Sequence, residues 1–266
     1  MSNVAAAEAP ARPFRWLRVP RGLLTAAGVV FAALLLLEIG TRIGVVPRFL
    51  IPQPSAVLVA LFEGLANGHL VYHAGVTTFE ALSGFAIACV LGLVLAVLIA
   101  EVRLMERAVY PWLVAIQATP KIALAPLFII WFGFGVSSKI AVATMICLFP
   151  VLVTTITGLH ATPPGLIETA RSMGASRWQV LRYIRFPSAL PHIFAGFSLA
   201  SVFAFTGAIV GEFIGASAGL GHLVLEANSR IRLDEAFAAL IVVALLGLAF
   251  FYAIDFASRR LLTWKH

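Results

Sequence analysis

Three polar residues in long apolar stretches are the first candidates for chemistry. Lys121 stands between Pro120 and Pro126 in a stretch that has no other charge. Gln117 precedes Lys121 by one helical turn, and Glu212 ends a different apolar stretch. Ionisable residues at membrane depth are costly and are functional candidates by default, and prolines free backbone groups that can line a cavity. These three residues are therefore our candidates for a polar path, and Lys121 would favour an anionic solute.

Each candidate also has a structural interpretation. Lys121 could pair with Glu80 or Glu212, or extend its side chain to the membrane surface. Glu212 could be a gate residue near the outer mouth of a path, or an interfacial acid paired with Arg230. Gln117 could hydrogen-bond a neighbouring helix, which is the more common use of such a residue. The sequence leaves these alternatives open.

A Gly-x-Ser-x-Gly motif at residues 215–219 suggests a catalytic serine, Ser217, with His222 as a base. The motif requires a strand before the serine and an acid that orients the histidine, whereas a long apolar segment precedes it here. An intramembrane serine hydrolase using Ser217 is therefore kept only as an alternative. The remaining histidines have no spacing typical of a metal site, and we expect no metal and no catalytic residues.

The composition of the chain predicts which secondary-structure elements position these residues. Of the 266 residues, 61% are hydrophobic and 12% are charged, whereas about a quarter of a soluble domain is charged. We therefore expect an all-α integral membrane protein. Uncharged stretches of roughly 20 residues predict six transmembrane helices. They lie near residues 22–40, 81–100, 108–132, 140–160, 191–214 and 236–257.

The basic residues orient the six helices. With the amino terminus inside, 13 of the 19 Lys and Arg residues fall in cytoplasmic segments and five in outer segments, among them Lys139. Short loops rich in these residues stay on the cytoplasmic side, so we expect both termini in the cytoplasm. The charge is spread over loop edges that face anionic lipid and forms no groove for nucleic acid.

The helices divide the chain into four expected segments. Val57, Leu61 and Leu65, four residues apart before an Asn-Gly stop, predict a short amphipathic helix on the outer membrane surface. The first transmembrane helix is expected to stay uncleaved, although the Arg cluster before it resembles a secretory signal. The segments are a cytoplasmic tail (1–21), the first helix with the amphipathic helix (22–72), a core of five helices (73–258) and a second cytoplasmic tail (259–266).

Small side chains recur at every fourth position of the second transmembrane helix, from Gly84 to Ala100. Such a stripe lets another helix approach closely. We interpret it as a packing face and not as part of a path.

Residues 162–187, after the fourth transmembrane helix, contain two short helices joined at a glycine. Thr162 is expected to cap the first helix, with Pro163 at its first helical position. Gly174 stands where a helix ends in a left-handed residue, a conformation that disfavours side chains with a Cβ.

The second short helix has its own signals. Ser176 and Gln179 form a Ser-x-x-Gln capping box that starts it, and Pro187 is expected to stop it. The pattern predicts a rigid helix-Gly-helix knob in the cytoplasm, and a basic amphipathic hairpin resting on lipid heads is the alternative.

This knob resembles the Glu-Ala-Ala loop of binding-protein-dependent ABC importer permeases, which docks on an ATPase subunit in that family. The residues that match are Glu168, Thr169, Ala170, Gly174 and Ala175, with Thr169 where the family usually has Ala. Three further stretches are similar to the nitrate, taurine and sulfonate branch of the family: LIPQPSAV, TPKIALAPLFIIWFGFGVSSKI and VGEFIGASAGLGHLV.

The resemblance implies a fold like that of type I importer permeases and a function as the translocation subunit of an ATP-driven importer in the bacterial inner membrane. The solute would be small and anionic, such as nitrate, a sulfonate or taurine. The implied partners are a second identical chain, two ATP-binding cassette ATPase subunits, an extracytoplasmic solute-binding protein and membrane lipid, with no nucleic acid.

ATP and Mg would be bound by the ATPase subunits. A Walker A loop ends in Gly-Lys-Ser or Gly-Lys-Thr, and the three lysines here, Lys121, Lys139 and Lys265, follow Pro, Ser and Trp. An ATP-independent secondary transporter is a further alternative, but the sequence lacks the internal repeat typical of that class.

Overall fold

The computed structural model describes residues 21–47 and 49–262, and every regular element in these two ranges is helical. Residues 1–20 of the tail predicted at 1–21, and residues 263–266 of the tail predicted at 259–266, lie outside the described residues. The chain divides into two compact units, Met1–Pro54 and Ser55–His266. The boundaries expected from the sequence at residues 72 and 258 fall within long helices, α3 and α11, whose bounds are given below.

The first unit contains α1 (Arg21–Arg42). Its 22 residues make a helix about 33 Å long at 1.5 Å per residue. Glu38 accepts hydrogen bonds from Arg42 Nε at 2.8 Å and from Gln53 Nε2 at 2.7 Å. These bonds connect the end of α1 to the segment that leads out of this unit.

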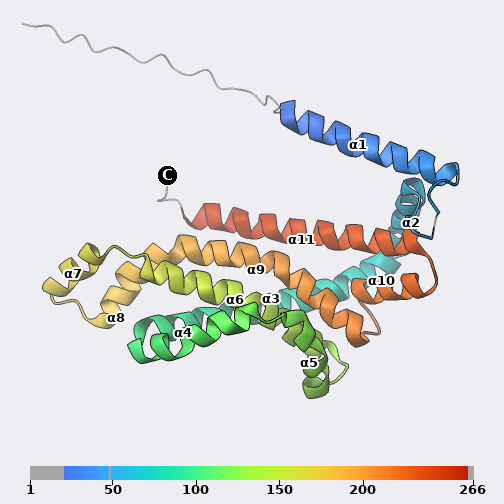
Figure 1. Cartoon of the computed structure of the whole chain (residues 1–266). Helices are drawn as coiled ribbons and strands as arrows, with labels where there is room; N and C mark the ends of the chain where they lie inside the picture. The colour runs from blue at the N-terminus through green and yellow to red at the C-terminus, as the bar shows by residue number, and fades with distance from the viewer. Residues whose placement is uncertain (1–20, 48, 263–266) are drawn as a thin grey trace, which may run out of the picture. The chain divides into compact units, whose positions relative to one another are not determined.

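The second unit is built on α3 (His69–Glu101), α6 (Val136–His160), α9 (Phe186–Gly215) and α11 (Leu233–Leu261). Among the described residues, these four helices are the ones long and apolar enough to cross a membrane. The helix that contains α9 is continuous from Arg177 to Gly215. α6 packs along both α3 and α9, and α11 lies against α9 (Figure 1). They coincide with four of the six expected transmembrane helices.

The third expected transmembrane helix, residues 108–132, is not one helix, so that prediction is corrected. It consists of α4 (Arg103–Ala118), a 3₁₀ turn η1 (Lys121–Leu124) and α5 (Ala125–Phe132). The break falls at Thr119, which is extended at φ −77° and ψ 135°. A proline disfavours the helical conformation in the residue before it, and Pro120 follows here.

Small side chains set the close approach of the central helices. A Cβ placed on Gly84 would lie 2.6 Å from the Ala143 Cβ, and one on Gly207 would lie 2.6 Å from the Ala143 Cα. Ala88 and Ala96 of α3 are fully buried. The packing face predicted from residues 84–100 is confirmed.

The predicted amphipathic helix is α2 (Pro54–Ala66). Its Val57 is buried against Leu70, Leu220 and Ala238, and Leu61 packs on the same cluster. The face of α2 that carries Val57 and Leu61 therefore rests on α3, α10 (Leu220–Ser229) and α11, whereas Leu65 is 43% exposed. The placement of α2 on the outer membrane surface stays a prediction.

Candidate functional site

The knob begins with α7 (Pro164–Ser172), one residue later than expected. Pro164, and not Pro163, lies in its first turn, and Thr162 does not cap it because its hydroxyl donates to the Leu159 carbonyl at 3.3 Å. Proline fits the first helical position because the missing N–H would have no partner there. With two prolines in succession, the second one starts the helix.

The glycine corner of the knob is confirmed. Gly174 has φ 87°, and the Ala175 N–H donates to the Ala170 carbonyl at 3.0 Å. This bond spans six residues, as in a Schellman motif. Thr169, the departure from the family pattern, donates its hydroxyl to the Gly165 carbonyl at 2.8 Å, and α7 continues through it to Ser172.

The start of the second short helix, α8 (Arg177–Val180), is also confirmed. The Gln179 N–H donates to Ser176 Oγ at 3.3 Å, and the Ser176 N–H donates to Gln179 Oε1 at 2.7 Å. These are the two reciprocal bonds of a capping box.

Pro187 does not stop this helix, which corrects the prediction. A π-helical turn, η2 (Leu181–Arg185), joins α8 to α9, and the Phe186 N–H donates to the Leu181 carbonyl five residues earlier. A proline cannot donate the bond to the residue four positions back, and the wider spacing of the π turn accommodates Pro187. One continuous helix therefore runs from Arg177 to Gly215, and the knob has no flexible joint on this side.

The knob presents apolar side chains to its surroundings. Leu166, Met173, Trp178 and Tyr183 are between 52% and 84% exposed, and Glu168 is exposed beside them. A rigid projection with exposed large apolar residues is typical of a protein contact surface. Chemically it can dock, but it carries no catalytic arrangement.

Lys121 lies in a cavity of about 570 Å³ beside α6 and α9. Its Nζ lies 4.9 Å from the centroid of the Phe149 ring, within the range of a cation–π contact. Thr119, Thr154 and Thr206 belong to the same lining, and each donates its hydroxyl to the main-chain carbonyl four residues earlier. The cavity thus combines one ammonium with a largely apolar wall.

The structure separates one of the other two path candidates, Glu212, from the cavity of Lys121. The main chain of Gln117 is in α4, and its side chain is outside what the structure describes. Glu212 does not line the cavity of Lys121; it is fully buried near the carboxyl end of α9. That end is opposite the knob along α9 (Figure 1).

Glu212 organises a buried polar cluster, which we define as His73, Thr77, Glu80, Lys139 and Glu212. Its Oε1 accepts from the Thr77 hydroxyl at 2.7 Å, and its Oε2 accepts from the Gly221 N–H at 2.5 Å. Thr77 Oγ1 accepts from the Leu220 N–H at 2.8 Å. The carboxylate therefore serves the amino terminus of α10, where the helix dipole favours negative charge.

The main chain of Gly219 also takes part in this cluster. Its N–H donates to His73 Nδ1 at 2.9 Å, and its φ is 116°. A Cβ at this position would collide with the carboxylate of Glu212. Glycine is required here both by backbone conformation and by space. The last glycine of the 215–219 motif therefore has a structural explanation that does not involve catalysis.

Lys139 is the residue that sequence reasoning missed. It was counted in an outer loop, but its side chain is only 3% exposed. Its Nζ donates to the carbonyls of Phe134, Gly135 and Gly215, the last two at 3.1 Å. Lys139, and not Lys121, therefore lies beside Glu80 and Glu212. The Gly215 carbonyl belongs to the carboxyl end of α9, where a cation is favourable, whereas Phe134 and Gly135 lie in the loop between α5 and α6.

The serine of the 215–219 motif lacks the geometry of a nucleophile elbow. α9, and not a strand, precedes Ser217, which lies in a bend. His222 lies 3.8 Å from Glu226 in α10, and its ring stacks at 6.2 Å from that of His73. Within the described ranges, no group of three or more His, Cys, Asp or Glu residues could hold a metal ion.

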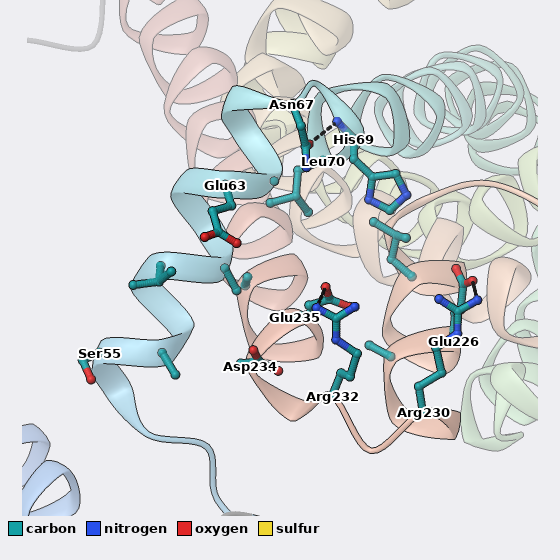
Figure 2. Close-up of a pocket in the computed structure, with 17 residues that line it drawn as sticks. Ser55, Glu63, Asn67, His69, Leu70, Glu226, Arg230, Arg232, Asp234 and Glu235 are labelled. Atoms are coloured by element: carbon teal, nitrogen blue, oxygen red, sulfur yellow. Dashed lines mark hydrogen bonds and ion pairs between the residues drawn. The ribbon is translucent and has the colours of Figure 1, made fainter.

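A polar pocket of about 450 Å³ lies between α2, α10 and α11 (Figure 2). Arg230 pairs with Glu226 at 2.7 Å, and not with Glu212 as one alternative had it, while Arg232 pairs with Glu235 at 2.5 Å. Glu63 and Asp234 add two more carboxylates to the lining, so acidic groups exceed basic ones. The lining of this pocket is therefore strongly charged.

These features define a helical membrane protein with a rigid docking knob and no catalytic centre in the part that the structure describes. A family model described as binding-protein-dependent transport system inner membrane component matches residues 88–263, and the chain belongs to this family. That membership confirms the prediction of an importer permease subunit rather than an enzyme.

Individual relatives support the same assignment. The riboflavin transport system permease protein RibX of Chloroflexus aurantiacus is 37% identical over 243 residues, which cover 90% of this chain and 91% of that protein. The aliphatic sulfonates transport permease protein SsuC of Bacillus subtilis is 30% identical over 224 residues, which cover 84% and 81%. The chain therefore spans most of the length of both relatives.

A solved structure shares the fold. A chain of the inward-facing MetNI methionine ABC transporter superposes with a TM-score of 0.62 at 21% sequence identity, covering 72% of this chain and 95% of that one. The all-helical, importer-permease fold expected from the sequence is confirmed.

Proposed function

We propose that this chain forms the translocation path of an ATP-driven importer for a small anionic solute. It works as a homodimer with two ATPase subunits, which bind the ATP and Mg, and with an extracytoplasmic solute-binding protein. Both termini are cytoplasmic. The observation that carries the proposal is the knob, because its fixed corner at Gly174 and its continuity with α9 make it suited to transmit force.

The knob supplies the ATPase contact in this proposal. Glu168, Thr169, Ala170, Gly174 and Ala175 are the proposed coupling residues, and the exposed apolar side chains beside them provide the buried area that a stable contact needs. The knob would move as a rigid body when the ATPase subunits close, and the attached helices would change the access of the cavity.

The cavity of Lys121 is the proposed solute path. Lys121 supplies one positive charge, which suits an anion. The hydroxyls of Thr119, Thr154 and Thr206 donate to main-chain carbonyls four residues earlier, so their oxygens face a solute only as acceptors. Gln117 and Glu212 were the other candidates for the path. We propose that Glu212 acts indirectly, by holding the turn before α10, because its carboxylate oxygens are occupied by Thr77 and Gly221.

The relatives are named for different solutes, riboflavin in one case and aliphatic sulfonates in another. We propose an anion because of Lys121. The polar pocket between α2, α10 and α11 is at the end of the bundle away from the knob, which suits the docking of an extracytoplasmic protein.

Reconstitution tests the proposed function. The chain is co-expressed with the ATPase and binding protein encoded beside it, the ligand that co-purifies with the binding protein is identified, and its uptake into liposomes is measured. We expect uptake only with ATP, the ATPase and the binding protein present. Uptake by the chain alone without ATP would instead establish a secondary transporter, and a fluorophosphonate label on Ser217 would revive the hydrolase.

A further inference from the structure

The knob is covalently joined to only two of the central helices. α6 leads into α7, and α8 leads into α9. α3 packs along α6 but its carboxyl end, Glu101, is far from the knob in sequence. If the knob moves as a body, α3 needs another connection to move with it.

Arg185 provides a direct contact with α3. Its Nη1 donates to Glu101 Oε1, across 84 positions of sequence, while its Nε and Nη2 both donate to the Leu159 carbonyl at 3.3 Å. One guanidinium therefore joins the base of α9 to the last residue of α3 and the last turn of α6. The planar fork of arginine suits such a divided contact, which lysine cannot reproduce.

The position and burial of this contact distinguish it from the other arginines of the knob. The side chains of Arg185 and Glu101 are 16% and 26% exposed, whereas Arg171, Arg177 and Arg182 are exposed. The positive charge also lies at the carboxyl ends of α3 and α6, where the helix dipoles favour it.

The surroundings of Arg185 are rigid. It is the last residue of the π turn, an irregularity that often occurs at functional sites. Leu159, Leu181, Ala189 and Ile193 form a buried cluster beside it. A displacement of α8 would therefore move the guanidinium and not be absorbed by loose side chains.

We propose that Arg185 and Glu101 form a transmission link that carries the displacement of the knob to α3. The two residues position helices and contact neither solute nor nucleotide. The inference rests on the proposed function as an ATP-driven importer, and it adds α3 to the parts that the knob moves directly.

Charge reversal in the reconstituted complex tests the link. The variants are Arg185→Glu, Glu101→Arg and the double exchange, with the milder Glu101→Gln beside them, and the readout is solute taken up per ATP hydrolysed. Coupling energies between sites are commonly worth about 5- to 150-fold, so we expect each reversal to lower this ratio on the order of tenfold while ATP hydrolysis continues. The double exchange should recover most of the loss.

Arg259→Glu is the matched control, because it breaks an exposed ion pair with Asp255 on α11, outside the knob. Thermal unfolding of each variant identifies loss of folding. If a reversal variant does not assemble, the solute taken up per ATP is measured for Glu101→Gln instead, because this substitution keeps the size of the side chain. Single variants with wild-type ratios, or a double exchange no better than the singles, would overturn the link. A wild-type complex without ATP-driven uptake would instead refute the proposed function.

Discussion

Removing the carboxylate of Glu212 should destabilise the whole second unit. In Glu212→Ala, the Thr77 hydroxyl and the Gly221 N–H lose the acceptors that they have at 2.7 and 2.5 Å, and no water is available because Glu212 and Thr77 are fully buried. Lys139 also loses a nearby negative charge. Breaking a buried charge group by removing one member costs about 3–5 kcal/mol.

The corresponding shift in melting temperature is large enough to measure. A change of 1 kcal/mol shifts Tm by roughly 2–4 °C in a chain of this size, so we expect Glu212→Ala to melt about 6–20 °C lower. Glu212→Gln keeps one acceptor but places an amide donor opposite another donor, which costs about 1–3 kcal/mol. Thermal unfolding in detergent, followed by size-exclusion of the remaining monodisperse protein, measures both variants.

Glu63→Ala is the matched control, because Glu63 is an exposed carboxylate at the same end of the unit, and exposed substitutions usually change stability by less than about 0.5 kcal/mol. Thr77→Val combined with Glu212→Gln gives a double-mutant cycle, in which residues in contact should show a coupling of about 0.5–3 kcal/mol. A Tm for Glu212→Ala within about 2 °C of wild type, or additive effects in the cycle, would refute the role assigned to the cluster.

Three further substitutions test other parts of the structure. Gly174→Val, which meets no atoms but requires φ 87°, should cost about 1–2 kcal/mol, which lowers Tm by about 2–8 °C, and should lower uptake per ATP. Gly207→Ala should lower stability by about 1–3 kcal/mol because its Cβ meets the α6 backbone, whereas Gly247→Ala, with 3.9 Å to its nearest neighbour, should be neutral or stabilising in the same melting assay. Lys121→Gln should weaken uptake of an anion on the order of tenfold, as the loss of about 1.4 kcal/mol implies, and unchanged uptake kinetics would remove Lys121 from the path.

The long helices could be predicted because membrane spans are specified by length and apolar composition alone. The predicted ends of the helices were less accurate, because each end depends on local hydrogen bonds of the backbone. Pro120 did break a helix, while Pro187 did not, because a π turn precedes it. The same residue type thus gave opposite results, and the difference lies in bonds that no periodicity reports.

The corner of the knob could be predicted because all its signals are local. Gly174, Ser176 and Gln179 lie within six positions, and their bonds close within the same short stretch. The role of Arg185 could not be predicted in the same way. Its acceptors, Glu101 and the Leu159 carbonyl, are 84 and 26 positions away, so nothing near Arg185 in the sequence indicates that it differs from Arg182.

Lys139 shows the physical limit of reading charges as markers of loops. It follows the apolar stretch of α5 and precedes that of α6, which is where a solvated outer charge is expected. Its ammonium is instead held by the carbonyl of Gly215, which ends α9 and is 76 positions away, and by the carbonyls of Phe134 and Gly135 in the loop between α5 and α6. The last carbonyls of a helix have no partner within the helix, so the end of α9 beside this loop needs a donor. The sequence shows that a lysine is present, but only the meeting of the α9 end with this loop shows why it is buried.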